Sequence, residues 1–291
     1  MKPARFSYHR PKTLGEALDL LAAHGDAAKL IAGGQSLVPV MNMRLAAPAQ
    51  LIDLNALPAL AEIVDRGAFI EVGALTRHHQ LAQSELVRSR CPLLAQAAET
   101  IGHYAIRQRG TIGGSLAHAD PTAQLPLIAV TLSAEIDIAS SRGRRTVNAA
   151  KFFLSVMTTA LEPDEIVVAI RFPVMRPGEG CAFRAFNRRI HDFAIVAVAA
   201  TLTVEKARIA ALRIGIGGVA PIPLAYGELC RRFIGQSADV DRVKELALAV
   251  RAAIEPEDNH RIPAEYRREL AQTLTERALT AALDRAQGNK A

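Results

Sequence analysis

Residues 30–37, LIAGGQSL, and residues 109–126, RGTIGGSLAHADPTAQLP, each contain a glycine pair followed closely by a serine. Glycine has no Cβ and tolerates positive φ, so such a backbone can approach an anion and present consecutive N–H groups to it. A single glycine pair is more typical of a tight turn after a strand. Two copies with similar flanks favour a clamp that holds the two phosphates of one pyrophosphate from opposite sides.

Two common nucleotide-binding motifs do not fit these stretches. Neither glycine pair is followed by the lysine of a P-loop, which argues against nucleoside triphosphate hydrolysis. Around residues 28–54 the pattern is strand, glycine pair, strand, without a long helix after the glycines. A dinucleotide fold of the Rossmann type needs GxGxxG at the start of a helix, so that fold is not expected either.

Composition is that of an ordinary globular protein. Of the 291 residues, 50% are hydrophobic and 22% charged, with a net charge of +6. The basic residues are scattered in pairs, and no basic stripe is interleaved with aromatics, so a nucleic-acid partner is not expected. Cys91, Cys181 and Cys230 lie far apart and cannot hold an iron-sulfur cluster or zinc unaided; we expect buried thiols. Without a signal peptide or an apolar run of membrane length, we expect a cytoplasmic protein with no integral membrane segment.

The chain up to residue 175 alternates helical and β-rich segments. Thr13 and Glu16 have capping-box spacing and Gly25 fits a helix end, which predicts a helix over 13–25. Thr76 could cap a helix, and Pro92 and Gly102 bracket another. Asp120 followed by Pro121 predicts a helix start. The β-rich segments are short strands before and after the first glycine pair, hairpins over 60–75 and 134–150, and a strand over 164–173.

RPGEG at 176–180 is the best candidate for a linker. Beyond it, three β-rich runs in hairpin order precede helical segments around 240–252 and 263–286. The sequence therefore predicts an α+β chain of three units, over 1–56, 57–175 and 176–291.

Four motifs together carry a resemblance to a known family: AGGQSLVPVMNMRL…LIDLN, TIGGSLAHADPTAQLP, DEIVVAIRFP and RRIHDFAIVAVAATL. In this order they resemble the FAD-binding medium subunit of molybdenum hydroxylases, the family of the carbon monoxide dehydrogenase flavoprotein and of the xanthine dehydrogenase FAD domain. The resemblance implies a two-part FAD-binding domain of the vanillyl-alcohol oxidase (PCMH) type. It also implies a C-terminal domain with a three-stranded antiparallel sheet and a helical bundle.

The resemblance also implies roles for individual residues around FAD. The pyrophosphate would lie between two sets, Ala32, Gly33, Gly34, Gln35, Ser36 and Leu37 on one side and Thr111, Gly113, Gly114 and Ser115 on the other. Ile101 would pack near the cofactor and Val167 would line its buried side. Asp120 and Gln124 would lie near the ribityl chain, although relatives often have a carboxylate where this chain has Gln124. Arg184 would be a cation close to the flavin ring, and Phe193 would bracket the ring.

His118, inside the second motif, could bond to the flavin or be an ordinary loop histidine. His191 and Asp192 could suggest a catalytic dyad, but the resemblance places their turn at the flavin edge. No catalytic acid or base and no metal ligand is expected in this chain.

The function implied by the resemblance is electron transfer. Substrate would be oxidised at a molybdopterin cofactor in a large subunit, and electrons would pass through two [2Fe-2S] clusters in a small subunit to FAD here, and then to an external acceptor. The complex would be a dimer of heterotrimers. A free-standing flavin-dependent oxidase of the same fold is the alternative, and a nucleotide-binding scaffold without redox function is a third. The sequence leaves substrate and acceptor open.

Overall fold

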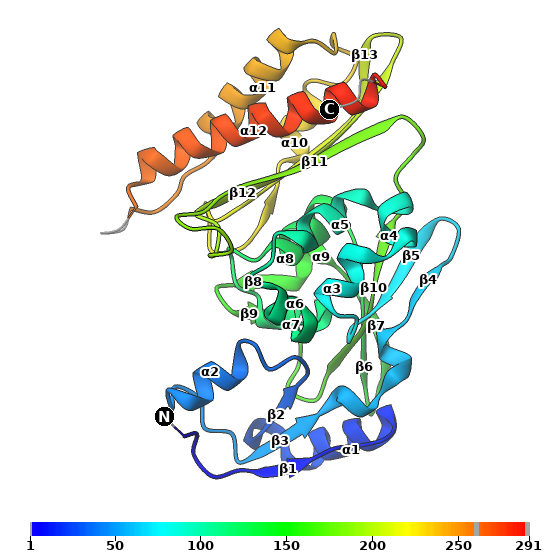
Figure 1. Cartoon of the computed structure of the whole chain (residues 1–291), viewed down its shortest axis with the longest axis vertical. Coiled ribbons are helices and arrows are strands. Elements are labelled where there is room, and N and C mark those ends of the chain that lie inside the picture. Colours follow the sequence, from blue (N-terminus) through cyan, green and yellow to red (C-terminus); the bar gives the residue numbers. More distant parts are fainter. Residues whose placement is uncertain (1, 259–261, 289–291) are drawn as a thin grey trace.

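The computed structural model describes residues 2–258 and 262–288 as an elongated molecule in three tiers, with the first residues of the chain in the lowest tier and α11 and α12 in the highest (Figure 1). The lowest tier is a sheet of order β1-β3-β2, formed by Ser7–His9, Gln50–Asp53 and Ala28–Ile31, in which β3 pairs parallel to both neighbours. Helix α1, Leu14–His24, packs on it and begins as predicted, with the Thr13 side chain accepting from the Glu16 N–H. Short α2, Leu37–Asn42, follows the first glycine pair.

The middle tier contains a sheet of order β4-β5-β10-β6-β7 and most of the helices. Its pairs are antiparallel, and the predicted hairpins over 60–75 and 134–150 are both present. The strands are Ile63–Asp65, Phe69–Gly73, Ile166–Pro173, Glu135–Ser140 and Gly143–Asn148. Helices α3 to α9 span His78–Gln83, Glu85–Arg90, Pro92–Glu99, Tyr104–Arg109, Ile112–His118, Gln124–Thr131 and Ala149–Phe152. Strands β8 and β9, Phe153–Ser155 and Thr158–Thr159, form a small hairpin beside them.

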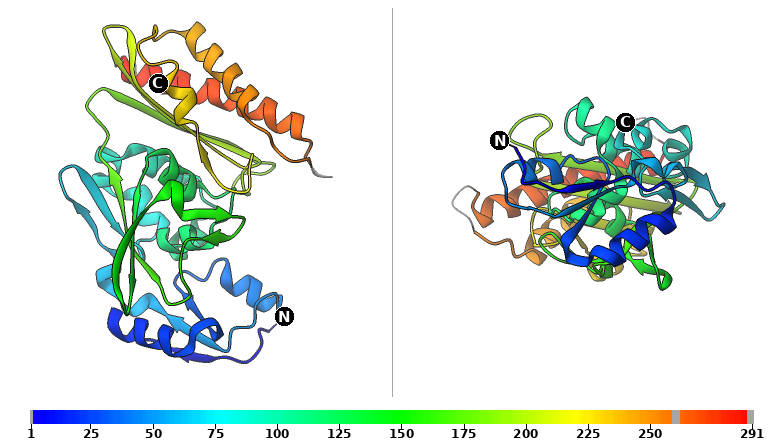
Figure 2. Two further views of the ribbon diagram at one scale, coloured as in Figure 1. Left: turned by 180° about the vertical axis from the view of Figure 1, so that it is seen from behind. Right: turned by 90° about the horizontal axis from the view of Figure 1, so that it is seen from below.

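The upper tier is an antiparallel sheet covered on one face by two long helices, as Figure 2 shows from behind. Strands β11, β12 and β13 are Glu179–Phe186, Val196–Glu205 and Arg208–Gly217, which are the three β-rich runs of the sequence. A short β14, Leu224–Ala225, adds a fourth strand at the edge. Helix α10 spans Gly227–Arg231, and α11 and α12 span Val240–Ala253 and Ala264–Ala286. Gly180 allows the close packing of α12, because a Cβ there would lie 1.8 Å from the Ala282 carbonyl oxygen.

The core of the described residues consists of three hydrophobic clusters, and the lowest of them also includes Ala139, Ile166 and Val168 from strands of the middle tier. The lowest includes Ala17, Leu21 and Ile52, the middle is built around Phe152, Phe172 and the helices α5 and α8, and the upper lies between the β11–β13 sheet and α11–α12. The other face of the upper sheet packs on the middle cluster through Cys181, Phe183 and Ala197. Cys91, Cys181 and Cys230 are buried free thiols, as predicted. No helix of the described residues is long and apolar enough to cross a membrane.

Candidate cofactor-binding site

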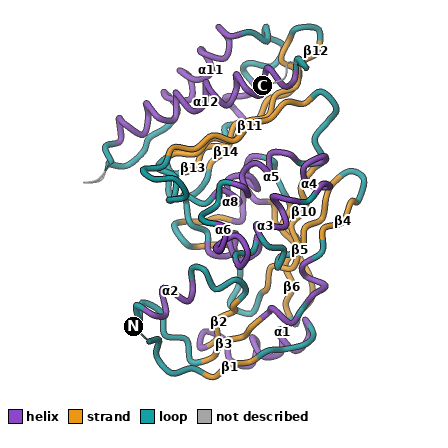
Figure 3. Tube along the Cα trace, in the orientation of Figure 1, coloured by secondary structure: helices purple, strands orange, loops and turns teal. Residues whose placement is uncertain are grey.

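The two glycine stretches touch each other. A Cβ at Gly33 would lie 2.2 Å from the carbonyl oxygen of Arg109 and 2.8 Å from the Cα of Gly110. Such distances leave no room for any side chain, so Gly33 is required by the contact between the two main chains. The loop between β2 and α2 therefore lies directly against the segment that leads into α7 (Figure 3).

The first glycine stretch has backbone donors without protein partners. Among the described residues, none of the five successive N–H groups from Gly33 to Leu37 donates a hydrogen bond. Gly34 has φ of +71°, the left-handed region that favours glycine, and the Gln35 side-chain amide donates back to the Gly33 carbonyl at 3.0 Å. Consecutive N–H groups in such a turn form a concave anion-binding site.

The second glycine stretch is the start of helix α7, and this corrects the loop expected from the sequence. Thr111 is the N-cap, and its hydroxyl accepts from the Gly114 N–H at 3.2 Å. The neighbouring N–H groups also have protein acceptors: Ile112 donates to Thr76 at 3.1 Å, Gly113 to Ala74 at 2.8 Å and Ser115 to Thr111 at 3.0 Å. What remains open here is the exposed Gly114 and the Ser115 hydroxyl, which makes no hydrogen bond within the described residues.

A group of polar side chains supports the first stretch from below. Asn55 donates its amide to the Ala32 carbonyl at 2.8 Å and to the Asp53 carboxylate at 2.5 Å, while Tyr8 donates its hydroxyl to Asp53. Asp53 is only 8% exposed. Burial raises the pKa of its carboxyl, but the hydrogen bonds from Tyr8 and Asn55 outweigh burial and hold that pKa below its ordinary value. Asp53 and Asn55 belong to the LIDLN motif, but sequence reasoning assigned them no role.

His78 supports the second stretch and was also missed. Its backbone N–H donates to the Gly110 carbonyl at 3.0 Å, and its ring lies where a Cβ on Gly110 would come within 2.7 Å of it. Both ring nitrogens are buried without a hydrogen-bond partner in the described residues. Burial lowers the pKa of His78 to about 4, so the ring is neutral at pH 7. The sequence predicted Thr76 as a helix cap, but the N-cap of α3 is Arg77, one residue later.

Val167 lies inside the hydrophobic cluster of the middle tier, and Ile101 lies at the margin of the same cluster. Val167 is buried at an irregularity in the β10–β6 pairing, and Ile101 packs against the same cluster. The Ile101 and Gly102 carbonyls are held by the Arg107 guanidinium at 3.0 and 2.6 Å. Their predicted contacts with the cofactor stay predictions.

The segment after α7 differs from its prediction. Asp120 is not a helix cap: its carboxylate accepts from the N–H and the hydroxyl of Thr122, at 2.8 and 2.6 Å, and α8 begins only at Gln124. The carbonyl of Pro121 accepts a hydrogen bond from the Gly218 N–H at 3.1 Å, in the upper tier. Gln124 is 6% exposed, and its amide makes no hydrogen bond within the described residues. His118 is the half-buried last residue of α7.

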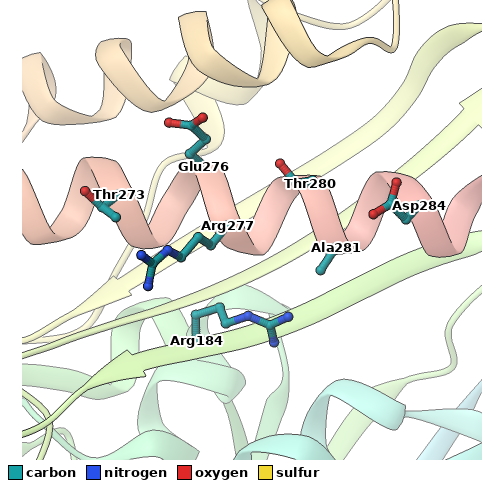
Figure 4. A pocket seen from close by; sticks show the side chains of 7 residues that line it. All are labelled: Arg184, Thr273, Glu276, Arg277, Thr280, Ala281 and Asp284. Carbon is teal, nitrogen blue, oxygen red and sulfur yellow. The ribbon is translucent and has the colours of Figure 1, made fainter. Parts of the chain in front are cut away.

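Arg184 lies apart from the other predicted site residues. Its neighbours Phe183 and Ala185 contact the middle cluster that holds Val167, so Arg184 points to the opposite face of β11. There it lines a cleft of about 600 Å³ with Glu276, Arg277 and Asp284 of α12 (Figure 4). Its guanidinium donates to the Phe183 carbonyl at 3.0 Å. This placement argues against the predicted contact between Arg184 and the flavin ring.

The loop between β11 and β12 reaches the segment beside Ile101. The rings of His191 and His103 have centroids 4.7 Å apart, and His103 lies two residues after Ile101. Phe193 in the same loop is 67% exposed. The structure does not bring His191 and Asp192 together as a catalytic dyad, because no hydrogen bond joins them among the described residues.

Comparison with known proteins agrees with this architecture. Residues 4–175 match the FAD binding domain in molybdopterin dehydrogenase, and residues 181–282 match the CO dehydrogenase flavoprotein C-terminal domain. The chain is 38% identical to the carbon monoxide dehydrogenase medium chain of Hydrogenophaga pseudoflava, over 97% of this chain and 98% of that one. It is 37% identical to the 6-hydroxypseudooxynicotine dehydrogenase complex subunit alpha of Paenarthrobacter nicotinovorans, over 100% and 98%.

A solved structure of carbon monoxide dehydrogenase from Hydrogenophaga pseudoflava superimposes with a TM-score of 0.94 at 38% identity, covering 98% of this chain and 99% of that one. The two domain matches together span nearly the whole described fold in the predicted order. The chain therefore belongs to the family of FAD-binding medium subunits of molybdenum hydroxylases, and it is an oxidoreductase subunit whose cofactor is FAD.

Proposed function

We propose that this chain is the electron-transfer subunit of a molybdenum hydroxylase. It would receive electrons from two [2Fe-2S] clusters in a small partner subunit and deliver them to an external acceptor. Substrate would be oxidised at the molybdopterin cofactor of a large subunit, in a dimer of heterotrimers. The full-length similarity to a carbon monoxide dehydrogenase medium chain supports the proposal. So does the count of three cysteines, because a [2Fe-2S] cluster bound by thiolates needs four.

The observation that carries the placement of FAD is the set of five successive N–H groups from Gly33 to Leu37, which have no acceptor within the described residues. They are the donors that a pyrophosphate requires, and the proposed site lies between the units over 1–56 and 57–175. On the opposite side Gly114 is exposed, and the Ser115 hydroxyl, which makes no hydrogen bond among the described residues, can donate to the ligand. The residues present therefore fit the pyrophosphate of FAD.

The rest of the chain would orient the cofactor. The buried Gln124 amide, which makes no hydrogen bond in the part of the chain that the structure describes, would bond to a ribityl hydroxyl, with Asp120 and His118 nearby. Ile101 and Val167 would pack on the apolar part of the cofactor. When bound, FAD supplies the redox chemistry, and what this chain contributes is binding, orientation and exclusion of water.

The substrate would be selected by the large subunit, and the names of relatives indicate its range. Carbon monoxide and 6-hydroxypseudooxynicotine are named for the two relatives above. Glyceraldehyde and nicotine are named for two further relatives, so we propose carbon monoxide, an N-heterocycle or an aldehyde as the substrate class of the complex.

Reduction of the flavin in two preparations tests the function. In the complete complex, the correct substrate should bleach the flavin absorbance and reduce an added acceptor. The isolated chain loaded with FAD should show no bleaching with the same substrate. A complex stripped of FAD should still oxidise substrate with an artificial dye that accepts electrons from the clusters. Direct bleaching in the isolated chain would instead support the free-standing oxidase.

A further inference from the structure

Arg77 connects the two glycine stretches, although no sequence motif includes it. We propose that Arg77 is a positioning residue that fixes the distance and orientation of the two stretches for the pyrophosphate of FAD. The inference rests on the proposed function, because it assumes that the pyrophosphate lies on these stretches. Arg77 acts through their backbone and not by touching the cofactor.

The guanidinium of Arg77 has one acceptor on each side. One terminal nitrogen donates to the carbonyl oxygen of Arg109, directly before the second stretch. The other donates to the Asn55 side-chain oxygen at 2.5 Å, and the Asn55 amide in turn donates to the Ala32 carbonyl at 2.8 Å, directly before the first stretch. Three hydrogen bonds in series, through the side chains of Asn55 and Arg77, thus join the Ala32 carbonyl to the Arg109 carbonyl.

The backbone of Arg77 is fixed as well. Arg77 forms an isolated antiparallel bridge with Thr111, the N-cap of α7, and its own N–H donates to the Gln80 side chain at 2.8 Å. The side chain therefore starts from a point that cannot move independently of the second stretch. Movement of the first stretch relative to the second would stretch the bonds through Asn55.

Fixing the two carbonyls also fixes the donors next to them. A peptide unit is planar, so the Ala32 carbonyl and the Gly33 N–H point in opposite directions in one plane. With the Ala32 oxygen held by Asn55, the Gly33 N–H, the first of the five groups without an acceptor in the described chain, has a set direction before any ligand arrives. The Arg109 oxygen, held by Arg77, is the atom against which Gly33 packs. Preorganised donors bind more tightly because less ordering is needed on binding.

Arginine suits this position for its shape. Its planar fork can donate to two acceptors at once, whereas an ammonium on a flexible stem acts as a point charge. Burial, and then repulsion by Arg109, lowers the pKa of Arg77 from its ordinary value. Arginine still stays protonated at pH 7. Replacement by lysine therefore keeps the charge and removes the two-sided fork.

Titration of FAD into the FAD-free full chain, followed by flavin fluorescence, tests the proposal in Arg77→Lys, Arg77→Met, Asn55→Ala and the double variant Asn55→Ala/Arg77→Met. We expect Arg77→Met and Arg77→Lys each to raise the dissociation constant at least tenfold. The double variant should bind FAD with the same affinity, within about twofold, as the single variant that binds FAD less tightly, because both residues act in one chain of hydrogen bonds. Wild-type affinity in Arg77→Lys would overturn the positioning role in favour of charge alone. Multiplying effects in the double variant would also overturn it.

Arg88→Met is the matched control. Arg88 also donates to a backbone carbonyl, that of Ala82 at 2.8 Å, and to side chains of the same tier, but it contacts neither glycine stretch. It should lower the unfolding temperature about as much as Arg77→Met while leaving FAD affinity within twofold of wild type; an equal loss of FAD affinity would contradict the proposal. Gly114→Val separates the two hypotheses. If it binds FAD normally, the pyrophosphate placement is wrong; if it loses FAD while Arg77→Met keeps it, only the positioning role is wrong.

Discussion

Within residues 2–258 and 262–288, the stretch from Gly33 to Leu37 keeps five backbone N–H groups without acceptors, whereas the stretch from Ile112 to Ser115 donates every one of its N–H groups to the protein. The first is an open turn, and the second is a capped helix start. An anion at the first stretch would gain hydrogen bonds at once. At the second it would meet the Ser115 hydroxyl, the open surface at Gly114 and the positive end of a short helix. The two stretches therefore have different roles although their sequences are similar.

The glycines within each stretch also differ. Gly33 and Gly113 are required by protein contacts, with Arg109 and Ala74 respectively, while Gly114 would meet only the Thr111 hydroxyl at 2.8 Å. The first kind of glycine holds the site together and the second leaves room for the ligand. Substitutions can separate these two reasons.

Gly33→Ala should have the largest effect, because its Cβ would overlap the Arg109 carbonyl oxygen. We expect the free energy of unfolding of the FAD-free chain to fall by about 3 kcal/mol, the upper part of the range for overpacking. Urea denaturation measures this. Gly15→Ala in helix α1 is the control, since the only neighbour of its Cβ would be the Thr13 hydroxyl at 3.9 Å and alanine favours a helix. Unchanged stability in Gly33→Ala would contradict the contact between the two main chains.

Lowering the pH should reduce the stability of the fold through His78, which packs against the second glycine stretch. The folded-state pKa of about 4 lies below the ordinary 6.5, so the unfolded chain binds the extra proton between these values. This contribution to stability is present above pH 6.5 and is lost as the pH falls towards 4, by up to about 3 kcal/mol. His78→Phe keeps a ring and should flatten that part of the pH profile measured by urea denaturation. His79→Gln should keep the slope; a wild-type slope in His78→Phe would refute the assignment.

Gly114→Val should weaken FAD binding about a hundredfold, equivalent to about 2.7 kcal/mol. It should also lower the unfolding midpoint of the FAD-free chain modestly, because its Cβ would lie 2.8 Å from the Thr111 hydroxyl that caps α7. The side chain would project from an exposed position into the space proposed for the pyrophosphate. Fluorescence titration gives the affinity and thermal unfolding gives the midpoint. Full FAD occupancy in this variant would exclude the second stretch from the site.

Local patterns predicted much of the fold because local chemistry decides it. The Thr13 cap, the hairpins and the long C-terminal helices are formed by neighbours in sequence. The helix start predicted at Asp120-Pro121 was wrong because both residues make other hydrogen bonds. The Asp120 carboxylate accepts from Thr122, and the Pro121 carbonyl accepts from Gly218, almost a hundred residues later. Such a tertiary contact leaves no local sequence signal.

The same limit applies to the site. The glycine stretches were predicted because a glycine pair followed by a serine is typical of a close approach to an anion, whereas Gln124 was predicted only because the family resemblance implied it. Arg77 and His78 were missed because an arginine and a histidine at the start of a helix look ordinary, and only the fold brings them to Arg109 and Gly110.

Ser115→Ala should weaken FAD binding about tenfold, which corresponds to about 1.4 kcal/mol and to the lower end of what a hydrogen bond to a charged group contributes. The equivalent Ser36→Ala should cost less, because the N–H groups of the first stretch remain. Both hydroxyls lack protein partners in the described residues, so neither change removes a bond from the folded chain. The ratio of the two affinities measures how far the stretches differ. Equal losses would show that the backbone donors of the first stretch do not dominate there.

Arg184→Met should have the smallest effect. A guanidinium beside the flavin would stabilise the reduced anion and raise the midpoint potential, but Arg184 faces α12 and donates to Phe183. We expect the potential, measured by dye equilibration, to change by less than about 10 mV, roughly twofold for a two-electron couple. Arg277→Met in the same cleft is the control. A fall of about 30 mV in Arg184→Met alone would mean that the guanidinium reaches the flavin after all. The face of β11 that packs on the middle tier would then not be the side on which the cofactor lies.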